Sequence, residues 1–292
     1  MFDEIGHVQR IPDCLGAEAA IRLRARFSRV TSCRMTTERQ HREQIVRFGR
    51  MIHERGYVAA TDGNLSVRLD SHRVLVTPTS MCKGMMVTSD LVTVDLSGEK
   101  LSGRRNVSSE IAMHLLIYKL RPDIKAVVHA HPPTATGYAA AGLPLNEALI
   151  SEVVICLGAI PLAKYGTPGT PELTDALEPL IPQYDAILMS NHGVVTYGED
   201  LLSAYMKMET VEHFAKVALV AHQLGRQQLL SHEEVEKLLA VRRKYAAANS
   251  VAPMPPAGNH NGSRPANGDG SRDRAPTGDP AGEARSRRRS AR

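Results

Sequence analysis

The spacing of apolar residues predicts an amphipathic helix over residues 37–55. Thr37 followed three residues later by Gln40 is typical of a capping box, in which the two residues close the first helical turn. Gly56 follows as a stop signal. The apolar residues that recur at helical spacing are Ile45, Phe48, Met51 and Ile52.

A β-hairpin is predicted directly after this helix, because two aliphatic stretches, 65–69 and 74–77, flank the polar residues 70–73. Further strands are expected at 91–96, 126–131, 186–189 and 194–197, and further helices at 110–120, 134–141, from Thr170 onwards, at 200–224 and at 231–245. Hairpins and mixed connections outnumber regular βαβ units. We therefore expect an α/β fold with a largely antiparallel central sheet flanked by helices.

Charge is concentrated at the two ends of the chain. The 292 residues carry a formal net charge of +5, of which residues 1–34 contribute +2 and residues 251–292 contribute +4. Residues 35–250 are close to neutral, at −1. The basic character therefore belongs to the ends and does not indicate a nucleic-acid-binding face on the core.

Neither end has the composition of a packed domain. Residues 251–292 contain six Pro and six Gly, and we expect a disordered basic tail rich in Pro, Gly and Arg. Its arginine cluster at 285–289 could contact nucleic acid or an acidic membrane, although a solvated tail without a specific partner is the favoured interpretation. Residues 1–34 are expected to be a disordered extension or to precede a natural start at Met35.

Composition also argues against several functional classes. Aromatic residues make up 4% of the chain with no Trp, fewer than proteins that stack single-stranded nucleic acid use. The chain contains no run of 18 apolar residues, so no membrane-spanning helix is predicted. The four Cys form no C-x-x-C pair and no disulfide framework, which favours a reducing, cytoplasmic compartment.

Three histidines are candidate metal ligands. His129 and His131 are two residues apart on a predicted strand, so both side chains point to the same face. His192 lies in a turn between two apolar strands. Three histidines with one open position are typical of catalytic zinc, although three unrelated histidines remain the alternative. We expect His114 to support this site from a helix without ligating the metal.

Glu110 opens a predicted helix directly after two serines. It could be an ordinary acid stabilised by the helix dipole, or a carboxylate that ligates the metal and moves a proton.

Three turns rich in hydroxyl and amide groups could together bind a phosphate with little help from Lys or Arg. Each is also compatible with an ordinary turn or helix start, and the serines at a helix N-terminus offer free N–H groups. The candidate residues are Gly63, Asn64, Thr79, Ser80, Ser108 and Ser109.

These motifs, in this order and spacing, resemble the class II aldolase/adducin family. The motifs are Gly63-Asn64-Leu65-Ser66, Thr77-Pro78-Thr79-Ser80, Ser108-Ser109-Glu110, His129-Ala130-His131 and Asn191-His192-Gly193. The resemblance covers about residues 37–246, so residues 35–250 are interpreted as the catalytic domain. It implies an αβα sandwich and a homotetramer with one Zn²⁺ per subunit and active sites at subunit interfaces.

The resemblance also implies roles for individual residues. His129, His131 and His192 match the zinc ligands, and Glu110 matches the acid that ligates zinc at rest and later serves as acid/base. The six turn residues match the phosphate-binding positions. Tyr245 matches a C-terminal tyrosine that reaches a neighbouring subunit's active site.

The implied activity is a zinc-dependent aldolase that cleaves a ketose 1-phosphate of the L-fuculose 1-phosphate type to dihydroxyacetone phosphate and an aldehyde. Zinc stabilises the enediolate and Glu110 protonates it. One departure concerns Ile150, which stands where the aldolases carry a tyrosine that exchanges a proton with the leaving aldehyde group; Glu152 is a candidate replacement. Lys83, near the second turn, is expected either to contact the phosphate or to be an exposed loop residue.

Three alternatives use the same fold. A decarboxylase of a phosphorylated 3-oxo sugar acid would form the same enolate. The 4-epimerases of pentulose 5-phosphates carry Asp where this chain has Glu110. Adducin-like scaffolds without catalysis lack the zinc histidines, which this chain retains.

Overall fold

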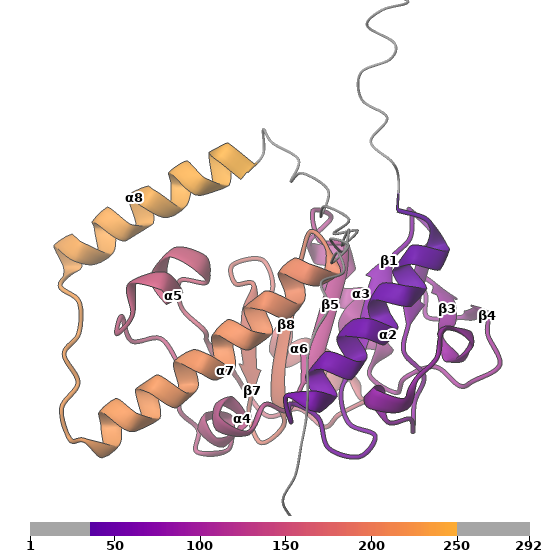
Figure 1. Cartoon of the computed structure of the whole chain (residues 1–292), viewed down its shortest axis with the longest axis horizontal. Helices are drawn as coiled ribbons and strands as arrows, with labels where there is room; N and C mark the ends of the chain where they lie inside the picture. Colours follow the sequence, from indigo (N-terminus) through magenta and orange to yellow (C-terminus); the bar gives the residue numbers. More distant parts are fainter. Residues whose placement is uncertain (1–35, 250–292) are drawn as a thin grey trace, which may run out of the picture. The chain divides into compact units, whose positions relative to one another are not determined.

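The computed structural model describes residues 36–249, with side chains described as far as residue 241. The expected features of 1–34 and 251–292 lie outside these residues. The described chain forms one eight-stranded sheet in the order β4-β3-β2-β1-β5-β8-β7-β6 (Figure 1). The strands are β1 Asn64–Arg68, β2 Arg73–Val76, β3 Val92–Asp95, β4 Lys100–Ser102, β5 Ala126–Ala130, β6 Leu162–Ala163, β7 Ala186–Met189 and β8 Gly193–Gly198.

All neighbouring strands pair antiparallel except β6 and β7, which are parallel. The expectation of a largely antiparallel sheet flanked by helices is therefore confirmed. The predicted hairpin is β1–β2, in which Ser66 lies opposite Val76.

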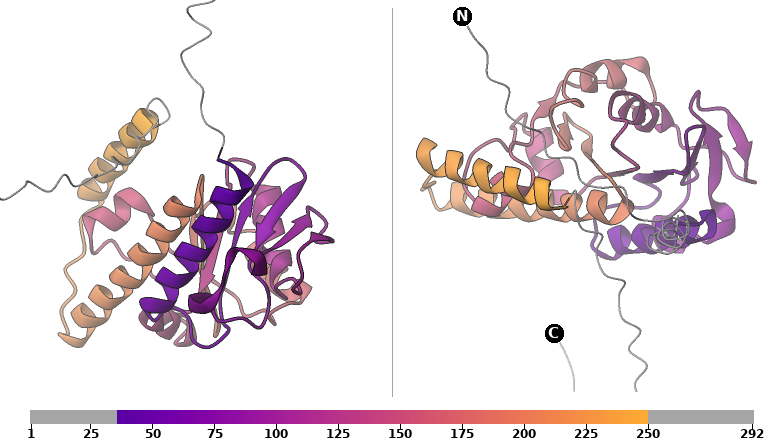
Figure 2. Two further views of the ribbon diagram at one scale, coloured as in Figure 1. Left: turned by 45° about the vertical axis from the view of Figure 1, so that its right-hand side comes forward. Right: turned by 90° about the horizontal axis from the view of Figure 1, so that it is seen from above.

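One face of the sheet is covered by α2 and α7, which lie side by side in the views of Figures 1 and 2, together with α4 and α5. These helices are α2 Glu38–Glu54, α4 Pro133–Ala140, α5 Ser151–Cys156 and α7 Leu201–Gln223. The predicted capping box of α2 is present, because Gln40 N–H donates to the Thr37 side chain and the Gln40 side chain accepts from Thr37 N–H. Buried residues of α2 pack against Leu65, Leu75 and Val128 of the sheet.

The opposite face is covered by α3 Ile111–Leu120 and α6 Pro171–Leu177, which pack on Val76, Val127 and Val195. Successive strand residues belong to alternate cores, as the two-residue period of a strand requires. Two buried layers on one sheet give the αβα sandwich that the sequence resemblance implied.

The remaining elements are two short 3-10 helices, η1 Lys83–Met85 and η2 Thr88–Asp90, and the last helix, α8 His232–Asn249. Among residues 36–249, no helix is long and apolar enough to cross a membrane.

The topology gathers five segments at one end of the central strands. Antiparallel pairing of β1, β2, β5 and β8 brings the start of β1, the end of β2, the end of β5 and the start of β8 to the same edge. Asn64 lies opposite His129, and Ala130 lies opposite Val194. Glu110, the N-cap residue of α3, joins them there.

Candidate functional site

Three imidazole rings meet at this edge of the sheet. One ring nitrogen from each of His129, His131 and His192 lies within 4.8 Å of the other two. The ring centroids are 4.8 to 5.2 Å apart, and the rings meet edge to face. The structure thus brings together the three residues proposed from the sequence as metal ligands.

A backbone contact orients His129. Its Nδ1–H donates to the carbonyl oxygen of Val194 at 2.9 Å, so Nε2 faces His131 Nε2 at 3.1 Å. His131 in turn places Nδ1 3.5 Å from the carboxylate of Asp62, a residue that the sequence interpretation had not selected. Partners of this kind fix the tautomer and orientation of metal-binding histidines.

Glu110 completes the group. Its Oε1 lies 3.0 Å from His192 Nε2 and its Oε2 lies 3.3 Å from His129 Nε2. Apart from its contact with His192, Oε1 is buried without a hydrogen-bond partner within the described residues. Three imidazole nitrogens and a buried carboxylate oxygen fit a divalent cation that prefers nitrogen ligands, as zinc does.

The charges of this group shift one another's pKa. Burial raises the pKa of Glu110, but the charges and hydrogen bonds of His129 and His192 outweigh it and hold that pKa well below its usual range. Burial lowers the pKa of His129, but Glu110 overcomes this and raises it above the ordinary value. For His131, burial and the neighbouring histidines lower the pKa to about 4.

Two glycines allow these segments to approach each other. A Cβ on Gly193 would lie 2.5 Å from the His131 ring, and a Cβ on Gly63 would lie 2.8 Å from the His129 carbonyl oxygen. Gly63 also has a positive φ of 71°. Glycine is therefore needed at both positions.

Strained backbone also surrounds the site. Ala60, Ser80 and Asn191 are the non-glycine residues of the described chain with positive φ, between 44° and 54°. Ser80 is itself a proposed site residue, Asn191 directly precedes His192, and Ala60 lies three residues before Gly63. Such conformations are costly and are found preferentially at functional sites.

A cavity of about 250 Å³ opens beside the histidines. All six turn residues proposed for phosphate line it, together with Glu110, His131 and His192. His129 lies buried behind this wall. Thr77 is not part of the wall, since it is buried and its hydroxyl accepts from Leu65 N–H.

Two arginines lie close to the turn that contains Thr79 and Ser80. An adjoining cavity of about 510 Å³ shares Thr79 and Ser80 with the site and is also lined by Arg104 and Arg105. Arg105 is paired with Asp90 at 2.8 Å.

Lys83 differs from both expectations. It is 1% exposed, so it is not an exposed loop residue, and its ammonium donates to the carbonyl oxygens of Thr61 at 2.8 Å and Met81 at 2.6 Å. It thereby ties the loop before Gly63 to the turn after Thr79. Burial lowers its pKa to about 8.

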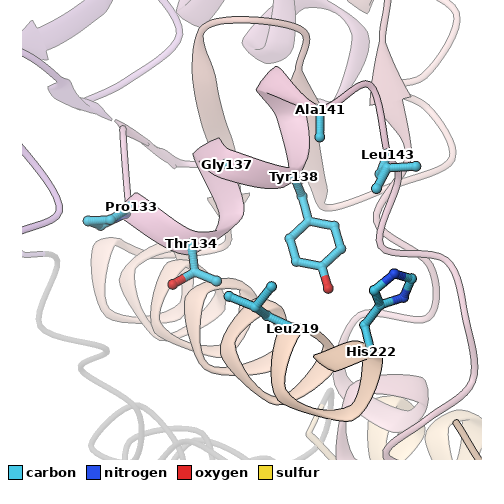
Figure 3. A pocket seen from close by; sticks show the side chains of 8 residues that line it. All are labelled: Pro133, Thr134, Gly137, Tyr138, Ala141, Leu143, Leu219 and His222. Carbon is cyan, nitrogen blue, oxygen red and sulfur yellow. The ribbon is translucent and has the colours of Figure 1, made fainter. Parts of the chain in front are cut away.

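Other proposed residues lie elsewhere. Ile150 precedes α5 and packs against the larger core, while Glu152 is exposed in the first turn of that helix. Tyr245 belongs to α8, but its side chain is outside the described residues. A separate apolar hollow of about 470 Å³ lies between α4 and α7, with Tyr138 and His222 projecting into it (Figure 3), and shares no residue with the site.

One family model and several known proteins match this chain. The family model for the class II aldolase and adducin N-terminal domain matches residues 43–219. The chain is 36% identical over 194 residues to a 3-oxo-tetronate 4-phosphate decarboxylase of Pectobacterium atrosepticum, covering 65% of this chain and 88% of that protein. It is 32% identical over 181 residues to an L-fuculose phosphate aldolase of Methanococcus maripaludis, covering 62% and 97%. The crystal structure of YgbL from Klebsiella pneumoniae superposes with a TM-score of 0.66 at 33% identity, covering 69% and 99%.

Proposed function

Because the chain belongs to the class II aldolase and adducin family, we propose that it is a metal-dependent carbon–carbon lyase acting on a phosphorylated sugar or sugar acid. The observation that carries the proposal is that the three convergent histidines and Glu110 lie at a cavity that three turns rich in hydroxyl and amide groups also line. We take the metal to be one Zn²⁺ per subunit.

His129, His131 and His192 would hold the metal. When bound, it would act as a Lewis acid that stabilises negative charge developing on the substrate's oxygens. Hydroxyl and amide groups of the turns bind the phosphate, and the binding energy of this non-reacting group can be used to position the reacting bond.

Two candidate reactions, decarboxylation and aldol cleavage, end in the same step, which is protonation of one enediolate. In a 3-oxo-tetronate 4-phosphate the bond from C1 to C2 breaks, carbon dioxide leaves and the electron pair stays on C2. In a ketose 1-phosphate the bond from C3 to C4 breaks, the electron pair stays on C3 and an aldehyde leaves. Both routes leave the enediolate of dihydroxyacetone phosphate. Glu110, which is ionised at rest, takes a proton from water and delivers it to the carbon that holds the electron pair.

The two reactions differ in how the carbon–carbon bond breaks, and this difference favours decarboxylation. Aldol cleavage requires a base to take the hydroxyl proton from the leaving carbon, whereas departing carbon dioxide carries no such proton. Apolar Ile150 stands where the aldolases carry their tyrosine. The decarboxylase relative is also the more similar of the two named above.

Aldol cleavage is the second candidate. It is supported by the similarity to the L-fuculose phosphate aldolase along nearly the whole length of that protein. Under this alternative, Glu152 would exchange the proton of the leaving aldehyde.

The test is product identity. The full chain, loaded with zinc, is incubated separately with 3-oxo-tetronate 4-phosphates and with a panel of ketose 1-phosphates that includes L-fuculose 1-phosphate. Carbon dioxide and dihydroxyacetone phosphate in equal amounts from the acid would support decarboxylation. An aldehyde from a ketose 1-phosphate would support aldol cleavage. If neither carbon dioxide nor an aldehyde is formed, both candidate reactions are overturned. The remaining alternatives are then 4-epimerisation and a non-catalytic scaffold.

The family resemblance adds two further proposals. The chain forms a homotetramer with interfacial active sites, which sedimentation analysis tests. Tyr245 contributes to turnover, so Tyr245→Phe should lower kcat without changing the metal content, and an unchanged rate would leave it as a helix residue only.

A further inference from the structure

A continuous hydrogen-bond chain joins the core of the sandwich to Glu110. Asn64 Nδ2 donates to Glu110 Oε2 at 2.7 Å, and Asn64 Oδ1 lies 2.5 Å from His114 Nε2. His114 Nδ1 lies 2.7 Å from the hydroxyl of Ser66, which lies 2.8 Å from the hydroxyl of Tyr118. Four residues, Asn64, Ser66, His114 and Tyr118, form what we call the relay.

Two regular periods place these side chains in one row. Glu110, His114 and Tyr118 are four residues apart and therefore share one face of α3. Asn64 and Ser66 are two residues apart on β1 and share the face of the sheet that α3 covers.

The relay is almost entirely buried and reaches the cavity only at Asn64. His114 and Ser66 are fully buried, and Asn64 and Tyr118 are at most 3% exposed. Burial lowers the pKa of His114 to about 3, so the ring is neutral at pH 7. Buried polar groups of this kind are costly unless every donor meets an acceptor, so the relay has a defined direction.

That direction starts at Glu110. A carboxylate only accepts hydrogen bonds, so the Asn64 group that faces it is the NH₂ group. Asn64 Oδ1 then faces His114, whose Nε2 must carry the proton. His114 Nδ1 is left as an acceptor for the Ser66 hydroxyl, and Ser66 accepts in turn from Tyr118.

We infer that the relay positions the carboxylate of Glu110, tethering Oε2 through Asn64 and leaving Oε1 to exchange the proton with the substrate. Oε1 makes no contact with the relay, and its polar neighbour in the described chain is His192 Nε2 at 3.0 Å. The inference rests on the proposed function, in which Glu110 delivers that proton. His114 acts through Asn64 and is a positioning residue; it does not touch the cavity wall.

The first test measures the tautomer and protonation state of His114 and does not depend on enzymatic activity. In full-length protein labelled with ¹⁵N-histidine, the His114 resonances are assigned as those that vanish in His114→Leu. We expect a neutral ring with the proton on Nε2 throughout the neutral pH range. A proton on Nδ1, or a doubly protonated ring, would overturn the direction of the relay.

The second test measures how the loss of the His114 hydrogen bond changes kcat, KM and metal content. His114→Leu keeps an apolar side chain of similar size but cannot donate to Asn64. We expect kcat to fall about 10- to 100-fold, as for other partners that orient reactive groups, with KM and metal content nearly unchanged. His114→Gln retains an amide donor and should recover most of the rate.

Proton delivery gives a further readout. For reaction in D₂O, the wild-type protein should place deuterium on one face of dihydroxyacetone phosphate, and His114→Leu should place it on both. Thr196→Val is the matched control, because it removes a buried hydroxyl that donates to Ala204 on the opposite face of the sheet. It should lower stability and leave kcat and stereospecificity intact.

The outcomes are separable. A folded, metal-loaded His114→Leu protein with wild-type kcat and stereospecificity would overturn the positioning role. Wild-type protein that forms no dihydroxyacetone phosphate would overturn the proposed function, and with it the role assigned to Oε1.

Discussion

His129 Nδ1 donates to the carbonyl oxygen of Val194 on the neighbouring strand at 2.9 Å. The pairing of β5 with β8 fixes this contact, because Ala130 lies opposite Val194. The sheet therefore sets the orientation of the His129 ring before any metal binds, and Nε2 is presented to the other two histidines.

His131→Ala should abolish metal binding, because it removes one of three convergent nitrogens. We expect less than one tenth of the wild-type metal content by elemental analysis and a loss of activity of at least about 100-fold. His72→Ala, in the exposed hairpin turn, is the control and should retain both. Full activity in His131→Ala would refute the assignment of the metal ligands.

Glu110→Gln should separate metal binding from proton transfer. The three histidines remain, so the metal content should stay near the wild-type value. The rate should fall about 10²- to 10⁴-fold, the range typical of a lost general acid or base. A rate within a few-fold of wild type would show that another group moves the proton.

Lys83→Met should weaken both stability and substrate binding. It leaves the carbonyl oxygens of Thr61 and Met81 without their charged donor, and hydrogen bonds to charged groups contribute about 1.5–3 kcal/mol. We expect urea unfolding to show a loss of this size and KM for the phosphorylated substrate to rise. Lys119→Met, an exposed lysine of α3, is the control. Equal unfolding midpoints and KM values for the two variants would contradict the role of Lys83.

Stability should depend on His114 in acid. Its folded-state pKa of about 3 lies below the ordinary value of 6.5, so between these values the unfolded chain binds a proton that the folded chain does not. Stability therefore falls as pH drops from about 6.5 towards about 3, by at most about 1.4 kcal/mol per pH unit. Metal-free His114→Leu should show a shallower decline than metal-free wild type in denaturant titrations between these pH values. Parallel curves would show that His114 is protonated in the folded state.

Period and spacing were enough to predict most of the sandwich. The alternation in β1 and β2 and the helical spacing in α2 identified those elements almost to the residue. The helix expected from Thr170 onwards is α6, and Thr170 is its N-cap residue, although its hydroxyl donates to the Thr167 carbonyl oxygen at 2.8 Å and makes no capping hydrogen bond.

Elements without a clear pattern were missed. The edge strand β4 has three exposed residues and no alternation, and β6 has only two residues. The stretch around Val153 is apolar and β-branched, yet it forms α5 because Val153 and Val154 pack into the interior.

The residues of the site likewise fall into those that a local sequence pattern predicts and those that only the tertiary structure shows. The interval of two residues between His129 and His131 predicts a shared direction, and the structure brings them together. The partners of Asp62, Lys83 and His114 are 22 to 69 residues away or are main-chain atoms, so no local pattern reveals them. Only the tertiary structure shows that Asn64, expected to bind phosphate, donates its amide to Glu110.

The most direct test of the metal-dependent site is a metal titration followed by product release. The full-length protein is stripped with a chelator, Zn²⁺ is returned in steps, and dihydroxyacetone phosphate is measured with the best substrate of the panel. We predict no release without metal, a linear rise to one Zn²⁺ per chain, and no recovery in His131→Ala. Release by the metal-free protein, or none by protein carrying one Zn²⁺ per chain, would contradict the account.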